Sequence, residues 1–103
     1  MGMNDKLNKK LAEWAGFKKS KYTTRLYDYP DKSKHYAELP NFPESLDACV
    51  KRLVPKLSHY FIGDSVDGHT ATVWNQSYSY GAKGNTPALA LCLAIEKLID
   101  GEK

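Results

Sequence analysis

The residues best suited to metal or nucleophilic chemistry are Cys49, Cys92 and His59. A structural zinc site needs about four ligands, usually in closely spaced pairs, and a cysteine nucleophile needs a neighbouring histidine. These three residues are far apart in the sequence, and no fourth ligand lies near them. Both cysteines fall on the apolar stripes of predicted helices, where a reduced thiol behaves as a small apolar side chain. We therefore expect two buried free thiols, no bound metal and no cofactor.

The remaining histidines and the glycines near the C-terminus carry weaker signals. His35 lies in a predicted loop and His69 follows a predicted turn, and the local sequence fixes no carboxylate or nucleophile beside either one. Lys83 and Gly84 precede a helix, but the Gly-Lys-Ser/Thr spacing of a phosphate-binding loop is absent. The sequence therefore predicts no catalytic residues, and an enzyme is the least favoured class of function.

Positive charge gathers at the N-terminal end of the chain. The formal net charge is +3, whereas residues 1–27 carry seven basic and two acidic side chains. Such a segment can attract nucleic acid or an acidic protein, but a solvated basic face without a partner is the commoner outcome. The candidate contacts are Lys18, Lys19, Lys21 and Arg25.

Tyrosines near this basic segment and beside the final helix leave two interpretations open. Aromatic rings with cationic neighbours could stack on bases or form protein-binding hot spots. The alternative is ordinary sheet packing with the hydroxyl groups at the solvent edge. The tyrosines concerned are Tyr22, Tyr27, Tyr29, Tyr78 and Tyr80.

Apolar side chains spaced three and four residues apart predict two helices before the hairpin. Residues 5–15 form the first one. The second begins at Pro43 or Ser45, and it ends or kinks near Val54 because Pro55 removes a backbone donor.

The final helix has both ends marked. Thr86 can cap its first turn, Pro87 suits its first position, and Gly101 suits its C-terminal cap. One face of this helix is a continuous apolar stripe, whereas Leu89 and Leu93 lie among charged residues on the other face. Either another segment covers this pair, or the pair contacts a second copy or another protein.

Residues 59–75 predict a β-hairpin around Asp67 and Gly68, a dipeptide typical of tight two-residue turns. The predicted pairs are Val66 with His69, Asp64 with Ala71, Ile62 with Val73, and Phe61 with Trp74. Large apolar pairs then lie on both faces of the hairpin, which favours helices on both sides. Residues 76–83 are expected to be mostly loop, with a short strand extension through Tyr80 at most.

Together these elements predict an α+β fold with three helices and a small antiparallel sheet, built from the hairpin and a strand near residues 22–29, in a three-layer α/β/α sandwich. With 42% hydrophobic and 26% charged residues, the composition is ordinary for one soluble domain over residues 1–103. No run reaches the roughly 18 apolar residues that cross a bilayer, and the N-terminus lacks a signal peptide's apolar segment. We expect a cytoplasmic protein that does not bind membranes.

Four segments carry a resemblance to a known family: residues 7–17, Leu39-Pro40-Asn41-Phe42, the hairpin that ends at Trp74, and residues 85–94. Taken in order, they resemble the phage α-β-α (ABA) sandwich domain family, and the final helix is similar to small phage proteins of the Nin-region X type. The resemblance implies a phage or prophage origin, a bacterial host cytoplasm and a three-layer sandwich, with no established activity or catalytic residues. Residues 18–34 are not part of the pattern.

Our expectation is therefore a small phage accessory protein that is not an enzyme and binds another protein or a second copy of itself. The candidate interface residues are Leu89, Leu93, Tyr78 and Tyr80. Nucleic-acid binding through the basic N-terminal third is the alternative.

Overall fold

The computed structural model of the chain describes residues 4–19, 27–30 and 38–101. The helices are α1 (Asn4–Trp14), α2 (Leu46–Arg52) and α3 (Pro87–Gly101), with short 3-10 turns η1 (Phe42–Glu44) and η2 (Val54–Lys56). The strands are β1 (Lys18–Lys19), β2 (Tyr27–Asp28), β3 (His59–Ser65), β4 (Gly68–Trp74) and β5 (Ser79–Gly84). The predicted α+β class is confirmed.

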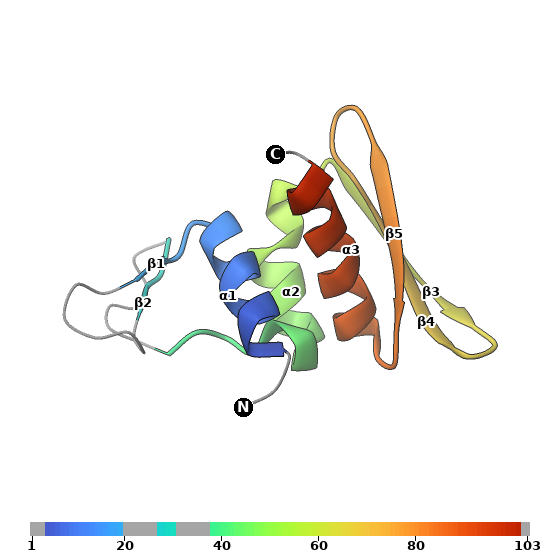
Figure 1. The fold of residues 1–103 in the computed structure, drawn as a ribbon, viewed down its shortest axis with the longest axis horizontal. Helices are drawn as coiled ribbons and strands as arrows, with labels where there is room; N and C mark the ends of the chain where they lie inside the picture. The colour runs from blue at the N-terminus through green and yellow to red at the C-terminus, as the bar shows by residue number, and fades with distance from the viewer. Residues whose placement is uncertain (1–3, 20–26, 31–37, 102–103) are drawn as a thin grey trace.

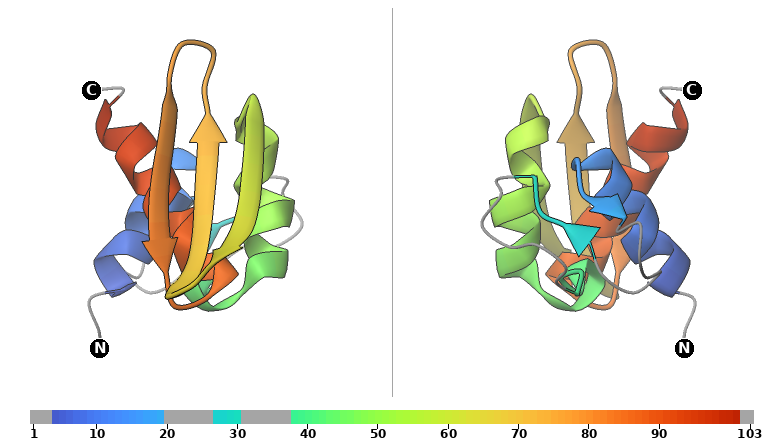
Figure 2. Two further views of the ribbon diagram at one scale, coloured as in Figure 1. Left: turned by 90° about the vertical axis from the view of Figure 1, so that its right-hand side faces the viewer. Right: turned by 90° about the vertical axis from the view of Figure 1, so that its left-hand side faces the viewer.

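Strands β3, β4 and β5 form an antiparallel sheet in the order β3-β4-β5. Figure 1 shows α3 packed along one face of this sheet, with α1 and α2 on the far side of α3. The predicted three-layer sandwich is not confirmed, because α1, α2 and α3 all lie on one side of the sheet (Figures 1 and 2). The other face of the sheet is covered by none of the described elements.

Helix α3 is central because the sheet contacts one side of it and α1, η1 and α2 contact the other. A helix between two layers must be apolar on both sides, and α3 buries Ala90, Leu91 and Ala94 as well as Ile95 and Leu98. Its start is as predicted: the backbone N–H of Leu89 donates to Oγ1 of Thr86 at 3.1 Å.

Strand β5 is the element that the sequence did not predict at full length. It spans six residues and runs along α3 in close contact. A Cβ atom on Gly84 would lie 2.7 Å from the backbone nitrogen of Ala90, so only glycine allows the two backbones to approach this closely. Farther along, Nζ of Lys97 donates to the carbonyl oxygen of Gly81 at 2.8 Å.

The hairpin turn lies one residue earlier than predicted. Val66 and Asp67 form the turn, and Ser65 pairs with Gly68. Gly68 is instead needed for close packing, because a Cβ atom there would lie 2.9 Å from the carbonyl oxygen of Gly84. The observed pairs are Tyr60 with Val73, Phe61 with Thr72, Ile62 with Ala71, and Asp64 with His69. The predicted pairs are therefore wrong. Moving the turn by one residue shifts each pairing partner by two residues, so every side chain stays on its predicted face.

The strand predicted near residues 22–29 does not join this sheet. Of the described residues in this predicted segment, Tyr27 and Asp28 form a strand, and they pair with Lys19 and Lys18 in a separate two-stranded sheet. Residues 22–26 of the predicted strand lie outside the described residues. Figure 1 places this small sheet at the opposite end of the molecule from β3, β4 and β5.

The first two helices begin and end close to their predicted limits. Oγ of Ser45 accepts the backbone N–H of Ala48 at 3.2 Å, so Ser45 caps α2, and the helix gives way to η2 just before Pro55. Asn8 of α1 holds the segment before α2, since its amide donates to the carbonyl of Pro40 at 2.8 Å and accepts the N–H of Phe42 at 2.9 Å.

Candidate functional site

The uncovered face of the sheet carries a cluster of three exposed or half-exposed rings, which we call the aromatic patch: His59, Phe61 and Trp74. The rings of His59 and Trp74 lie side by side across the β3–β4 pair, with centroids 4.9 Å apart and a 50° tilt. Phe61 is 58% exposed, and its ring lies over Gly63, where a Cβ atom would be 2.8 Å from it. Exposed aromatic side chains of this kind are typical of protein interfaces.

The rest of this face is nearly free of charge. By strand register, the side chains that share it with the aromatic patch are Ser65, Thr70, Thr72, Ser79 and Lys83, together with Gly63, Gly68 and Gly81. Lys83 lies at the corner and its Nζ is 3.8 Å from Oδ1 of Asp67 in the turn. The face therefore presents rings beside small polar groups, with one paired cation at its margin.

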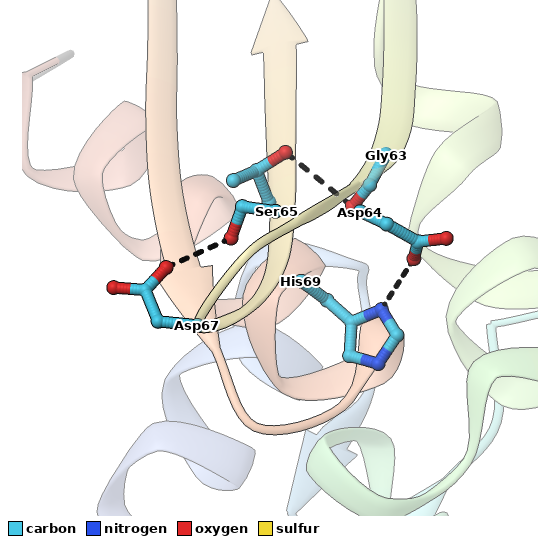
Figure 3. Close-up of polar contacts among 6 residues, drawn as sticks. Gly63, Asp64, Ser65, Asp67 and His69 are labelled. Atoms are coloured by element: carbon cyan, nitrogen blue, oxygen red, sulfur yellow. Dashed lines mark hydrogen bonds and ion pairs between the residues drawn. The ribbon is translucent and has the colours of Figure 1, made fainter.

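A second group of polar side chains lies at the hairpin tip, in the close-up of Figure 3. Nδ1 of His69 is 2.8 Å from Oδ1 of Asp64, a partner that the sequence did not predict and that follows from the observed register. Oγ of Ser65 donates to Oδ1 of Asp67 at 3.1 Å. This hydrogen bond, more than the nearby Lys83 ammonium group, lowers the pKa of Asp67 below its ordinary value.

The hairpin tip does not bring a nucleophile to the histidine. Ser65 and His69 lie on opposite faces of the sheet. Ser65 pairs with Gly68 and shares its face, and His69, the next residue along β4, points to the other face. The Asp64 carboxylate can orient the imidazole of His69, but the hydroxyl of Ser65 is directed to Asp67 instead. The tip holds an oriented histidine and no Ser-His-Asp arrangement.

The predicted interface residues are distributed between the core and the surface. Leu89 and Leu93 are half-buried and pack against the core. They precede Lys97 and Gly101 at four-residue spacing on α3, and these two residues meet Gly81 and Tyr80 of β5. Tyr80 is half-buried because its ring lies against Gly101 of α3. Tyr78, in contrast, is 67% exposed in the connection between β4 and β5.

The predicted nucleic-acid contacts lie at the other end of the molecule. Lys18 and Lys19 are exposed on β1, whereas Lys21, Arg25 and Tyr22 lie outside the described residues. Tyr27 and Tyr29 are buried, and Tyr29 packs edge-on against Phe17 with ring centroids 4.7 Å apart. These two tyrosines therefore pack in the core and have no exposed face on which a base could stack.

The two cysteines and His59 do not form a metal site. Cys49 and Cys92 are buried free thiols, as predicted, with their sulfur atoms 3.5 Å apart. His59 is exposed on the aromatic patch. Among the residues that the structure covers, no group of three histidine, cysteine, aspartate or glutamate side chains is placed to hold a metal ion. His35 lies outside the described residues, and none of the described helices has the length and apolar character to span a bilayer.

A scan against protein-family models finds no match, and neither does a comparison with curated proteins. Among solved structures, the chain is similar to a phage protein from Bacillus cereus ATCC 14579, with a TM-score of 0.76. The likeness covers 97% of this chain and 90% of that one at 10% sequence identity. The fold is therefore that of a known phage protein. The resemblance to the ABA sandwich family is not tested by this likeness.

Sequence reasoning placed Phe61 and Trp74 on the same face of the hairpin but did not identify the aromatic patch as a surface. The alternation of the hairpin predicted a large apolar pair on each face, and a covering layer was assumed for both. None of the described elements covers this side, since the described helices pack around α3 instead. Only the three-dimensional arrangement reveals which of the two apolar faces stays open.

Proposed function

We propose that the chain is a small phage accessory protein without catalytic activity, and that it binds another protein through the aromatic patch. The observation that carries this proposal is the exposure of Phe61 beside the neighbouring rings of His59 and Trp74, on a sheet face that no described element covers. Exposed aromatic clusters on otherwise well-packed domains mark interaction sites. The structural likeness to a phage protein supports the phage assignment.

The proposal can be tested by capture from a lysate of phage-infected bacterial cells with the immobilised full chain. We expect the wild type to retain a specific protein and Phe61→Lys to lose it, because a charge in the centre of an aromatic contact is costly to desolvate. Val66→Lys is the matched control, since Val66 is a fully exposed apolar residue on the neighbouring turn. Retention of the same protein by Phe61→Lys, or of none by the wild type, would contradict the proposal.

Nucleic-acid binding is the second candidate, and one observation favours it. A shallow depression between the end of α1 and η2 is lined by Lys51, Arg52 and Lys56 together with Ala15, Pro30 and Pro55. Three cationic side chains around one depression suit a phosphate group. The exposed lysines of β1 add positive charge at this end of the molecule.

An electrophoretic shift series on DNA and RNA at increasing salt separates this second candidate from the first. If phosphates are bound, the affinity falls steeply with salt, and Lys51→Glu together with Lys18→Glu weakens it. Lys83→Glu is the control, because Lys83 lies on the sheet at the opposite end. Absence of a shift at low salt would exclude this function.

A further inference from the structure

The two edges of the three-stranded sheet are not equivalent. At the β5 edge, the ammonium group of Lys97 donates to the carbonyl oxygen of Gly81, so a backbone acceptor on this edge is already occupied. Lysine at a sheet edge is a known means of preventing further strand pairing. At the β3 edge, no described residue pairs with the outer side of the strand.

The hairpin geometry identifies which backbone groups of β3 are unpaired. A two-residue turn closes on a hydrogen-bonded pair, here Ser65 with Gly68, and such pairs recur at every second residue. The bond from the N–H of Asn75 to the carbonyl of Tyr78, on the other side of β4, fits the same alternation. The residues of β3 whose N–H and C=O groups point away from β4 are therefore Tyr60, Ile62 and Asp64.

Apolar surface lies on both sides of this edge. Phe61 lies on the uncovered face of the sheet, and Tyr60, on the opposite face, is 36% exposed. Helix α2 lies behind the edge and extends beyond it in Figure 2. Phe61 and Tyr60 are two of the five large apolar side chains that the described part of the chain exposes.

The dimensions of the site favour a single strand over a folded partner. The uncovered face measures roughly 300 Å² from strand length and spacing, whereas a stable interface needs about 800 Å² per partner. A second copy paired through the same edge would bring its own α2 behind the shared seam, where α2 already lies. A peptide strand has no such helix, and its backbone supplies the alternating donors and acceptors that Tyr60, Ile62 and Asp64 require.

We propose that the outer edge of β3 binds an extended, uncharged peptide segment of another protein, which joins the sheet as a fourth strand. The main chain of Tyr60, Ile62 and Asp64 provides the hydrogen bonds, and Phe61 and Tyr60 contact apolar side chains of the segment on the two faces. This inference rests on the proposed protein-binding function and names the form of its partner.

The test uses the full chain and a display library of random dodecapeptides as the probe. Selected peptides should slow amide hydrogen exchange at Tyr60, Ile62 and Asp64, while Phe61 and Gly63, which already bond to β4, stay unchanged. Methylating alternate backbone nitrogens along the bonding edge of a selected peptide should abolish binding. The proposal is overturned if no peptide is selected, or if the bound peptide leaves those three amides unprotected.

Two variants separate the failure of this inference from the failure of the proposed function. Tyr60→Pro removes an outward N–H without touching the bonds to β4, and it should weaken peptide binding at least about tenfold. Phe61→Lys keeps the backbone of the edge and disrupts the aromatic patch. If the captured phage or host protein is lost with Phe61→Lys but retained by Tyr60→Pro, the protein-binding function stands and strand addition is wrong. If peptides still protect the edge when no protein is captured, strand addition stands alone.

Discussion

Cys49 and Cys92 face each other in the core, and Sγ of Cys49 also lies 3.1 Å from the carbonyl oxygen of Phe42. The hydrogen bond between the thiols, together with burial, raises the pKa of Cys92 far above its ordinary value. The same hydrogen bond lowers the pKa of Cys49, but both sulfur atoms are fully buried, so a reagent reaches neither the thiol of Cys92 nor a thiolate at Cys49.

We therefore expect neither cysteine to react with a thiol-specific chromogenic disulfide reagent in the folded protein, and both to react once urea unfolds it. Absorbance after addition of the reagent measures the number of reacting thiols. A Val66→Cys variant provides the control, because its thiol at the exposed turn should react at once. Rapid labelling of the native cysteines in the wild type would show that the pair is accessible.

Tyr27 makes folding stability depend on pH at the alkaline end. Burial raises the pKa of its phenol, and the neighbouring Glu13 carboxylate raises it further. Above the unfolded-state pKa of about 10, the unfolded chain loses this proton while the folded protein retains it. The contribution of Tyr27 to the free energy of unfolding is therefore complete below the unfolded-state pKa, and it is lost as the pH rises through the pKa of the folded protein.

Tyr27→Phe removes this linkage and should flatten the alkaline fall in stability. Urea unfolding of both proteins between neutral pH and about pH 11 measures the difference in the free energy of unfolding. The variant should lose stability less steeply than the wild type above pH 10. Parallel curves for the two proteins would mean that the phenol of Tyr27 titrates alike in both states.

At the scale of elements, the contact between β5 and α3 depends on a glycine in one place and not in another. A Cβ atom on Gly84 would meet the backbone of Ala90 at 2.7 Å, whereas one on Gly81 would lie 3.5 Å from the carbonyl oxygen of Ala71, an ordinary contact. Gly84→Ala should therefore cost about 1–3 kcal/mol of unfolding free energy. Gly81→Ala, on the same strand, should change it by roughly 0.5 kcal/mol or less. Equal losses in urea unfolding would mean that strand propensity, not this contact, sets the cost.

The helices were predictable because their signals are local, and the sheet was not because its signals depend on other segments. Ser45 and Thr86 cap their helices as the sequence indicates. The Asp67-Gly68 dipeptide, in contrast, favours a turn that tertiary packing overrides, since Gly68 is needed beside Gly84. Strand β5 has low strand propensity and forms because α3 and β4 hold it on two sides.

The candidate site was not predictable for the same reason, because its exposure depends on how distant segments pack. If residues 76–83 form a loop, Leu89 and Leu93 are surplus apolar residues, whereas in the structure both are half-buried on the helix that packs against β5. The aromatic patch, in turn, is part of a core only if a further layer covers it. Which apolar face is closed is a property of the packing of whole elements, and one sequence does not contain it.

On the scale of the whole molecule, the two candidate surfaces lie at opposite ends of an elongated domain, 44 Å in its longest dimension. The sheet with the aromatic patch forms one end, and β1 with its exposed lysines forms the other (Figure 1). At this separation, exposed charges are screened from each other at physiological salt. We expect Lys18→Glu with Lys19→Glu to leave peptide binding at β3 unchanged, as measured by titration calorimetry, and a loss of binding would show that the two ends are coupled.

The hydrogen bond from Lys97 to Gly81 also bears on how the protein behaves when crowded. A sheet with two available edges can template its own growth into fibres, but here one edge is blocked by the lysine. Lys97→Ala should therefore shorten the lag time of fibre formation in mild denaturant, monitored with an amyloid dye, whereas Lys83→Ala should not. Once a partner strand occupies β3, this chain has no available edge of its own, and further sheet growth depends on the outer edge of the bound strand.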